Sequence, residues 1–460
     1  MSSFDIISPS TNEILAHRDY SDGNAIEKAL AKATAAFKEW RRTSLAQRAE
    51  ICLKMIQHFQ NNIELFSEEI TMQMGRPIQY SPFEIKGGLR ERAEYMIKIA
   101  ADTLADQKVS ELNGFERFIK REPLGTILVL APWNYPYLTS VNTIIPALMA
   151  GNTVILKHAT QTALCAERYL EAFQAAGLPD GVFEILHLDH DQVSEIIKDK
   201  RIAYTAFTGS TEGGKAIQKA IGTRFISSGL ELGGKDPAYV CSDSDLGNSI
   251  KNLVDGSFFN SGQSCCGIER IYVQEDVFDE FVDGFVKLTK NYILDDPMNN
   301  ATTLGPMVRI KNAQSVIDQI ESAVANGAVE LIDRDDFPIM PLPYLAPQVL
   351  INVDHMMDIM KEETFGPVVG IMPVKSDEQA VKLMNDSRYG LTASIWTNDL
   401  ERALRIGDHV ETGTWFMNRC DYLDPELAWT GVKDSGKGCT LSTLGYNQVT
   451  RPKSFHLKLK

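Results

Sequence analysis

Two adjacent cysteines, Cys265 and Cys266, lie near the middle of the 460-residue chain, directly after the residues GQS at 262–264. A cysteine thiolate is a strong nucleophile, so one of the two could form a covalent bond to a substrate carbon. A free cysteine is also a small apolar residue that packs readily in a core. The pair by itself leaves both interpretations open.

Two further segments carry groups that could assist a nucleophile. Asn134, in PWNYP at 132–136, could donate its side-chain amide to an oxygen that becomes negatively charged, although Asn before a helix also forms an Asx turn. Glu231, in ELGGK at 231–235, could act as a general base or lie solvated at a turn. Taken alone, each motif favours the structural interpretation at least as much as the chemical one.

A glycine-rich segment, GSTEGG at 209–214, follows an expected strand and opens an expected helix. Free backbone N–H groups at a helix start can hold a phosphate, but the spacing is not GxGxxG and a plain tight turn fits equally well. The acidic pair 362–363 before Phe365-Gly366-Pro367 is, by itself, typical of the protein surface.

Short apolar runs alternate with helical stretches between residues 125 and 222, which predicts a doubly wound parallel sheet. The expected strands are 125–130, 152–157, 182–186 and 203–208, and the expected helices are 138–150, 163–176, 191–198 and 213–222. Sheets of this type bind nucleotides at the carboxyl ends of their strands. A second α/β unit is expected from about residue 233, with strands at 238–240, 271–273 and 368–373.

The flanking segments have other periodicities. The first hundred residues read as helical, with apolar residues at helical spacing over 24–40, 45–66 and 82–104. Gly114–Arg121 and Lys453–Lys460 alternate apolar and polar residues, as exposed strands do. Lone exposed strands of this kind often pair with another subunit.

The composition, 44% hydrophobic and 23% charged, is that of a globular protein. A net charge of −15 argues against nucleic acid or an anionic membrane as a partner. We find no signal peptide and no apolar run long enough to span a bilayer. The seven cysteines are mostly scattered, and there are no CxxC pairs or clustered histidines, so we expect neither disulfides nor a metal site. This cysteine usage predicts a cytoplasmic setting.

In this order the segments closely resemble the aldehyde dehydrogenase superfamily. The resemblance rests on Pro132-Trp133-Asn134, Lys157, FTGS at 207–210, ELGGK at 231–235, NSGQSC at 260–265 and ETFGP at 363–367. It covers essentially the whole chain, including GVKDSG at 431–436. It implies an α/β fold with two doubly wound parallel-sheet domains and a small oligomerisation β-element.

The resemblance also implies how the chain divides. Residues 1–105 and 124–232 would form a dinucleotide-binding domain, and 233–440 a catalytic domain. Residues 106–123 and 441–460 would form a strand-pairing element that reaches across the subunit interface of a homodimer or homotetramer.

Family members oxidise an aldehyde to a carboxylic acid with NAD or NADP. By position, Cys265 matches the nucleophile, Asn134 a donor to the oxyanion, and Glu231 the base that activates water against the thioester. Glu231 favours hydrolysis over acyl transfer to coenzyme A. A non-catalytic structural relative is the remaining alternative, and the intact set of three residues argues against it.

Cofactor contacts carry over in the same way. The matching positions are Trp133, Lys157, Gly209, Ser210, Glu363 and Phe365. Thr160 stands where strictly NAD-dependent relatives often carry a Glu that grips the ribose 2′-hydroxyl. Without that carboxylate a 2′-phosphate meets no like-charge repulsion, and His158 is close in sequence, so we expect NADP to be accepted as well as NAD.

The family's aldehyde pocket corresponds to residues 135–142 and 417–429. The candidate substrate contacts are Tyr135, Asn142, Arg419, Leu423 and Trp429. Arg419 could bind the carboxylate of an ω-oxo acid such as succinate semialdehyde, or instead pair with Asp421 or Asp424 and shape the loop. A broad preference for uncharged aliphatic or aromatic aldehydes is the alternative.

Overall fold

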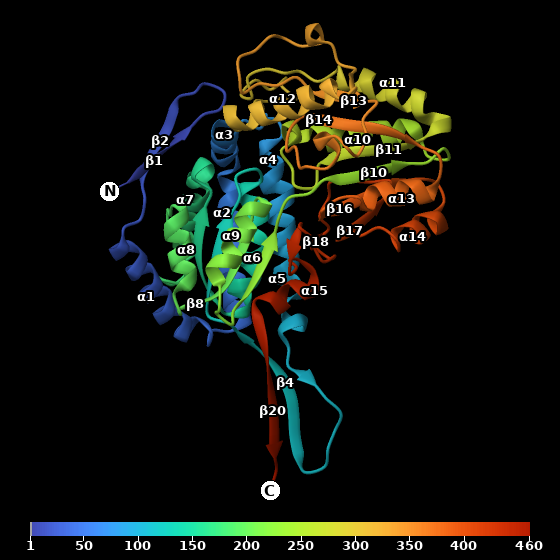
Figure 1. Ribbon diagram of the computed structural model, residues 1–460. Coiled ribbons are helices and arrows are strands. Elements are labelled where there is room, and N and C mark those ends of the chain that lie inside the picture. The colour runs from blue at the N-terminus through green and yellow to red at the C-terminus, as the bar shows by residue number, and fades with distance from the viewer. Residues whose placement is uncertain (1) are drawn as a thin grey trace.

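The computed structural model describes residues 2–460, with position 334 described by its backbone only. Two sheet units with helices packed around them lie next to each other, and a narrow β-sheet projects from the first of them (Figure 1). This arrangement agrees with the expected α/β class. Among residues 2–460, none of the helices combines the length and apolar character that a membrane crossing requires.

The first sheet has six strands in the order β19-β9-β8-β5-β6-β7. Their bounds are Gly436–Lys437, Ser227–Glu231, Ile202–Thr208, Thr126–Ala131, Thr153–His158 and Phe183–Ile185. All neighbours are parallel except β19, which runs antiparallel to β9. The connecting helices are α6 (Pro136–Ala150), α7 (Ala163–Ala175), α8 (His190–Lys198) and α9 (Thr211–Ile221). The predicted strand–helix alternation is confirmed within two residues at most boundaries.

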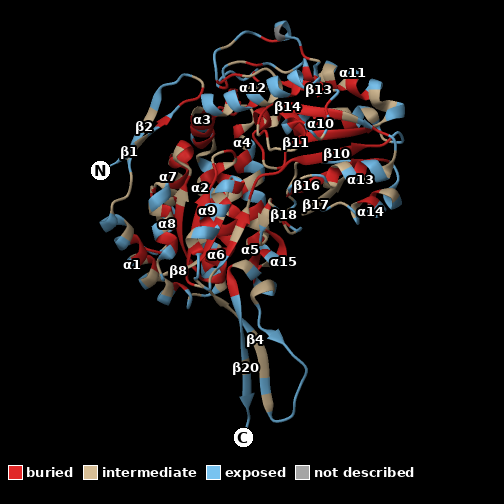
Figure 2. Ribbon diagram, in the orientation of Figure 1, coloured by how far each residue is buried: buried red, intermediate tan, exposed pale blue. Residues whose placement is uncertain are grey.

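The second sheet has seven strands in the order β12-β13-β14-β11-β10-β16-β17. Their bounds are Val329–Glu330, Gln348–Ile351, Val368–Val374, Ile268–Gln274, Asp236–Val240, Thr392–Trp396 and Thr414–Met417. The helices of this unit are α10 (Leu246–Phe258), α11 (Phe278–Thr289), α12 (Ile310–Ala325), α13 (Asp377–Asn385) and α14 (Leu400–Gly407). The central strands are buried (Figure 2), including the charged residues Asp236, Glu269 and Arg270 that they carry.

The N-terminal hundred residues contain a hairpin as well as helices. Strands β1 (Ser3–Ile7) and β2 (Ile14–Asp19) pair antiparallel, a feature that helical periodicity did not predict. Strand β1 has only five residues and only Ile6 of them is buried, so its alternation is too short to stand out beside the helical pattern that follows. The helices that follow are α1 (Gly23–Trp40), α2 (Leu45–Asn61), α3 (Ile63–Met74), α4 (Ser81–Phe83), a π-helical turn (Glu84–Leu89) and α5 (Arg90–Leu104).

The projecting sheet consists of β3 (Gln107–Lys108), β4 (Phe115–Pro123) and β20 (Thr450–Lys458), in the order β20-β4-β3. The two alternating segments are strands, as predicted, and within this chain they pair with each other over nine residues. The Phe118 and Phe455 rings stack across the pair with centroids 4.5 Å apart. Helix α15 (Ser442–Gln448) precedes β20 and packs against α5 and α6.

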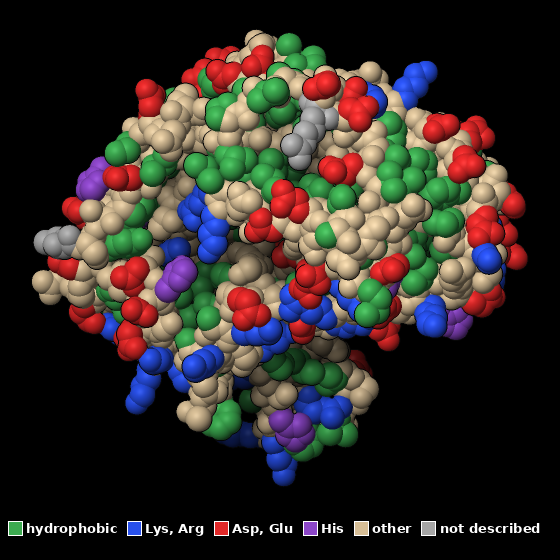
Figure 3. All heavy atoms as spheres, turned by 45° about the horizontal axis from the view of Figure 1, so that its top comes forward, with side chains coloured by type: hydrophobic (Ala, Val, Ile, Leu, Met, Phe, Trp, Pro, Cys, Tyr) green, Lys and Arg blue, Asp and Glu red, His purple; other side chains and the backbone are tan. Residues whose placement is uncertain are grey.

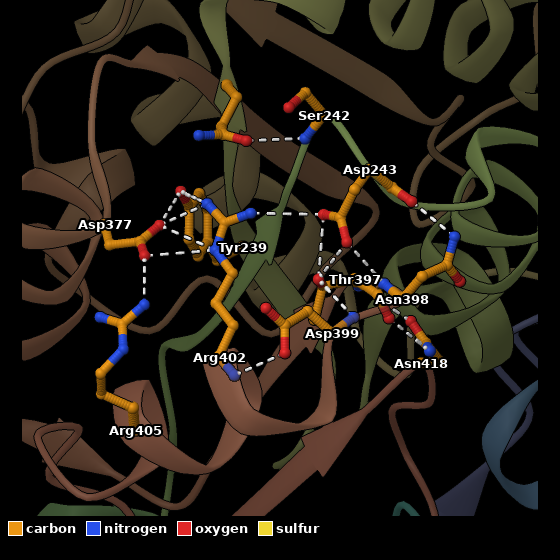
Figure 4. A network of polar contacts seen from close by, with 11 residues as sticks. Tyr239, Ser242, Asp243, Asp377, Thr397, Asn398, Asp399, Arg402, Arg405 and Asn418 are labelled. Atoms are coloured by element: carbon orange, nitrogen blue, oxygen red, sulfur yellow. Dashed lines mark hydrogen bonds and ion pairs between the residues drawn. The ribbon is translucent and has the colours of Figure 1, made fainter.

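A polar network at the end of the second sheet anchors the start of segment 417–429 (Figure 4). Arg402 of α14 forms ion pairs with Asp243 and Asp377. Thr397 donates its hydroxyl to Asp243, and it exchanges two hydrogen bonds with Asn418, of 3.1 and 2.8 Å. The network therefore fixes where the segment leaves β17.

Candidate active site

A cavity of about 470 Å³ lies between the two sheet units. Figure 3 shows a hollow in one face of the molecule with basic side chains beside it. Most of the predicted catalytic and cofactor residues line the cavity, namely Trp133, Asn134, Lys157, Gly209, Ser210, Glu231, Cys265, Glu363 and Phe365. Sequence reasoning missed three further polar lining residues, His190, Ser194 and Asn312, which belong to no motif.

The first sheet brings these residues together because its strands are parallel. Strand β5 ends at Ala131, β8 at Thr208 and β9 at Glu231, and all three carboxyl ends meet at one edge of the sheet. Asn134 follows the first of these ends and Gly209 the second. The cavity is therefore at the place where sheets of this kind bind ligands.

The two cysteines have different surroundings. Cys265 is half-buried and lines the cavity, whereas Cys266 is buried, with only 3% of its surface exposed. The Cys266 thiol donates to Asp421 Oδ1 at 2.9 Å, and a hydrogen bond with Cys265, together with burial, raises the pKa of Cys266 well above its usual range. Of this pair, Cys265 is the thiol that a molecule in the cavity can reach.

A tight turn presents Cys265 to the cavity. Asn260 and Ser261 have φ values of 54° and 56°, and Gly262 has a φ of 67°. A Cβ at Gly262 would lie 2.2 Å from the carbonyl oxygen of Gly366, so only glycine fits there. The glycine before the cysteine motif is thus required by the approach of the ETFGP segment.

Asn134 is held from both sides. Its side-chain Nδ2 donates to the Gln263 carbonyl at 3.1 Å, and its own carbonyl accepts from Arg76. Arg76 forms a buried ion pair with Glu84, whose Oε1 accepts the Tyr137 backbone N–H at 2.7 Å. Arg76 and Glu84 therefore position the Asn134 segment, and the sequence offered no motif that pointed to them.

Glu231 is half-buried and accepts two hydroxyl hydrogen bonds, from Thr440 at 2.6 Å and from Thr208 at 3.1 Å. Burial raises the pKa of its carboxyl, and the two hydroxyls and Arg92 oppose that shift. A carboxyl with a raised pKa that lines the same cavity as a thiol has the properties of a general base.

Two ionisable groups in the cavity have few of the hydrogen bonds and ion pairs that buried charged groups usually make. The Lys157 ammonium makes no hydrogen bond or ion pair within residues 2–460, and burial lowers its pKa to about 8. The Glu363 carboxyl accepts one hydrogen bond, from the Gly234 N–H at 3.1 Å, and burial with the nearby Glu269 raises its pKa to about 8. Ligand hydroxyl groups would satisfy both, and an anionic ligand group would satisfy Lys157.

The glycine-rich segment offers a third binding feature. Ser210 is the N-cap of α9, and its hydroxyl accepts from the Gly213 N–H at 3.2 Å. A Cβ at Gly209 or Gly213 would lie 2.6 Å from the Phe207 ring, so the backbone must be glycine at both positions. The start of α9 lines the cavity at Ser210 and Gly213, and N–H groups at a helix start suit a phosphate.

An aromatic pair closes this part of the cavity. The Trp133 and Phe365 rings meet edge to face, with centroids 5.6 Å apart. Glu363, Phe365, Lys157 and the α9 start therefore line one cavity, with groups that can bind hydroxyls and an anion.

Two residues considered for a 2′-phosphate lie outside the cavity lining. Thr160 opens the 3-10 turn Thr160–Thr162 and is not among the lining residues. His158 is buried, its Nε2 lies 3.1 Å from the Pro136 carbonyl, and burial lowers its pKa to about 3. The sequence proximity of His158 was therefore misleading, because its side chain points into the core.

None of the predicted substrate residues lines the cofactor cavity, and Leu423 and Trp429 belong to the apolar cluster that includes Cys265 and Cys266. Trp429 and Asn142 are buried, and Leu423 packs against the core. The Tyr135 ring lies 4.6 Å from the Arg76 guanidinium. Among the described residues, Arg419 makes no ion pair with Asp421 or Asp424; its exposed guanidinium lies 3.5 Å over the Tyr422 ring instead.

The fold and the cavity define an α/β enzyme that can hold a nucleotide at strand ends beside a reachable thiol, an amide and a carboxyl. The family model described as "Aldehyde dehydrogenase family" matches residues 1–455. The chain belongs to this family and is an NAD(P)-dependent aldehyde dehydrogenase, as the resemblance implied.

Three similar proteins span nearly the same length. The NAD(P)+ succinate semialdehyde dehydrogenase Sad of Escherichia coli (strain K12) is 35% identical, over 96% of this chain and 95% of that protein. The NADP+ succinate-semialdehyde dehydrogenase 1 of Mycobacterium tuberculosis (strain H37Rv) is 32% identical, over 97% and 98%. The structure of succinic semialdehyde dehydrogenase from Streptococcus pyogenes with NADP+ has a TM-score of 0.94 at 29% identity, covering 99% and 100%.

Proposed function

We propose that the protein oxidises a short ω-oxo acid, such as succinate semialdehyde, to the free dicarboxylic acid through covalent catalysis at Cys265. The observation that carries the mechanism is that Cys265, Asn134 and Glu231 line one cavity together with the dinucleotide-binding features. The substrate class is supported by the relatives named as succinate semialdehyde dehydrogenases.

In the first step the Cys265 thiolate attacks the aldehyde carbon, and the carbonyl oxygen becomes an oxyanion. One hydrogen of the Asn134 amide is used by Gln263, and the second is free to donate to that oxygen. The Cys265 backbone N–H would be the other donor. In comparable sites such a donor contributes about 3–4 kcal/mol to transition-state stabilisation.

The cofactor would be held by residues whose polar groups make few hydrogen bonds within the protein. Lys157 would bind the adenosine ribose, the α9 start the pyrophosphate, and Glu363 the nicotinamide ribose. When bound, the nicotinamide supplies the acceptor for the hydride that leaves the thiohemiacetal carbon and so yields a thioester at Cys265. We expect NADP+ to be used as well as NAD+, and Thr160→Glu to lower the NADP+/NAD+ preference.

The thioester is then hydrolysed. Glu231 would take a proton from the attacking water, and its raised pKa makes it a stronger base than an exposed glutamate. Thr208 and Thr440 would hold the carboxylate while no water is bound. The acid leaves and Cys265 is restored as the thiol.

Reduced cofactor absorbance with purified protein tests this function. The panel contains succinate semialdehyde, acetaldehyde, benzaldehyde and a long-chain aldehyde, each with NAD+ and with NADP+. We expect the highest kcat/KM with succinate semialdehyde. Equal or better use of the uncharged aldehydes would favour the broad-specificity alternative, and no turnover with any of them would favour a non-catalytic relative.

We further propose that the protein is a homodimer or homotetramer, in the cytoplasmic setting that its cysteine usage predicts. Strand β20 is the edge of the projecting sheet, and its outer side has no partner among the described residues. A nine-residue exposed edge strand is a template for pairing with a second chain. Removal of residues 453–460 should lower the sedimentation coefficient, and a truncated protein that sediments as the full chain does would contradict this assembly.

A further inference from the structure

Arg92, on α5, is a buried guanidinium without an ion pair. Only 6% of its surface is exposed, and no carboxylate within residues 2–460 forms a salt bridge with it. Its Nη1 donates to the Leu138 carbonyl at 2.8 Å and to Asn142 Oδ1 at 3.4 Å. Arginine is rarely buried unless it is paired, because an uncompensated charge in the interior is costly.

The guanidinium edge formed by Nε and Nη2 has no hydrogen-bond partner among the described residues. Neither atom is fully enclosed by the protein. These two nitrogens therefore reach open space. Their N–H bonds are parallel and have the spacing of the two oxygens of a carboxylate, the geometry of a bidentate pair.

Arg92 does not line the cofactor cavity, and its polar contacts are with Asn142 and, electrostatically, with Asp421 of segment 417–429. Its charge is attracted by the carboxyl groups of Glu231, Glu91 and Glu84. Segment 417–429 closes over the same region, since the Tyr422 hydroxyl donates to Glu91, the neighbour of Arg92 on α5, at 2.8 Å. Arg92 thus lies beside the predicted aldehyde-side residues.

Several carboxyl groups surround Arg92, and each has other partners. Glu84 pairs with Arg76, Glu231 accepts from Thr208 and Thr440, Glu91 accepts from Tyr422, and Asp421 accepts from Cys266 and Ser264. Their charges favour the protonated guanidinium, but none of them takes its free edge. An anionic ligand is the partner that this edge lacks.

We propose that Arg92 is the anion anchor of the aldehyde site and binds the carboxylate at the far end of an ω-oxo acid substrate. This inference rests on the proposed function and makes it more specific. Leu138 and Asn142 fix one edge of the guanidinium, which presents the Nε and Nη2 edge to the substrate. Arg419, by contrast, is exposed, and its guanidinium is stacked on Tyr422.

The test compares succinate semialdehyde with butanal, which has the same four-carbon chain without the carboxylate. The variants are Arg92→Gln, Arg92→Lys and the rival Arg419→Gln. The matched control is Arg90→Gln, because Arg90 lies on the same helix and pairs with Glu94 at the surface. Circular dichroism and the thermal midpoint verify that each variant is folded.

We expect Arg92→Gln to lower kcat/KM for succinate semialdehyde roughly 10- to 100-fold, mainly through KM, and that for butanal less than about threefold. Arg92→Lys should give an intermediate loss, because it keeps the charge but not the bidentate geometry. Succinate should inhibit butanal oxidation by the wild type competitively and by Arg92→Gln much more weakly. Arg90→Gln should behave as the wild type.

Two outcomes would overturn the inference alone. In one, the wild type prefers succinate semialdehyde, but Arg92→Gln and Arg92→Lys keep that preference while Arg419→Gln loses it. In the other, the Arg92 variants lose activity equally with both aldehydes, which indicates a structural role. A wild type that does not prefer succinate semialdehyde contradicts the proposed substrate class itself, before any variant is compared.

Discussion

The Asn134 side chain is tied to the cysteine turn, because its Nδ2 lies 3.1 Å from the carbonyl oxygen of Gln263, two residues before Cys265. The first sheet supplies Asn134 and the second unit supplies the turn. Asn260 of the turn also donates its Nδ2 to the Asn134 carbonyl, at 3.4 Å. These hydrogen bonds across the two units hold the oxyanion donor and the nucleophile in register, and the second hydrogen of the Asn134 amide is left for the substrate.

Asn134→Ala should lower kcat about 100- to 1,000-fold, the usual effect of removing one oxyanion donor. The change also removes the tie to Gln263, so alkylation of Cys265 by iodoacetamide should be measured in parallel. Normal alkylation with reduced kcat would assign the loss to the oxyanion. A kcat within threefold of the wild type would contradict the role of Asn134.

Cys265→Ala should abolish dehydrogenase activity, because no other thiol lines the cavity. Cys266→Ala should retain most of it, since the Cys266 thiol is directed at Asp421. Mass spectrometry after alkylation of the native protein should find the label on Cys265 first. The reverse pattern of activity and labelling would exchange the roles of the two cysteines.

Local patterning predicted the strand end before Gly209, because an apolar run there is followed by a helical stretch. Glu231 was assigned only through the family resemblance, since no strand was expected at β9, which the structure places at Ser227–Glu231. The hairpin β1–β2 escaped prediction because only Ile6 of β1 is buried. The mutual pairing of β4 and β20 is a contact between segments far apart in the chain, which alternation alone cannot assign.

Arg76, Glu84 and Arg92 could not be predicted from the sequence for the same reason. The guanidinium of Arg76 contacts Asn134 and Asn260, 58 and 184 residues away along the chain. The role of Arg92 depends on which neighbours already have partners. Roles of this kind depend on contacts between residues far apart in the chain, and sequence patterns do not show such contacts.

Glu84→Gln should destabilise the protein by about 3–5 kcal/mol, because it leaves the Arg76 charge buried and unpaired. Below the lowered thermal midpoint, kcat should also fall, since Arg76 holds the Asn134 carbonyl and Glu84 the start of α6. Urea denaturation and steady-state kinetics measure the two effects. Glu94→Gln, which breaks the surface pair with Arg90, is the matched control and should cost no more than about 1 kcal/mol.

Glu231→Gln should slow hydrolysis of the thioester more than hydride transfer. A burst of reduced cofactor equal to the enzyme concentration, followed by slow turnover, would show this in stopped flow. In the wild type, burial raises the pKa of Glu231, and the base must be ionised. Steady-state kcat should therefore fall as the pH drops through a value above 4.5, and this acidic limb should be absent in Glu231→Gln. Unchanged steady-state turnover in the variant would contradict the role of Glu231 as the base.

Lys157 should make the kcat/KM for the cofactor fall as the pH rises, whereas Glu231 makes kcat fall as the pH drops. Burial lowers the pKa of its ammonium to about 8, so the free protein loses this charge as the pH rises through that value. Because a 2′-phosphate is attracted more strongly by the charged form, kcat/KM for NADP+ should decline above pH 8 more steeply than that for NAD+. Lys157→Met should weaken both cofactors, NADP+ more than NAD+, and should remove the difference between the two pH profiles. Parallel profiles for NADP+ and NAD+ in the wild type would place the 2′-phosphate away from Lys157.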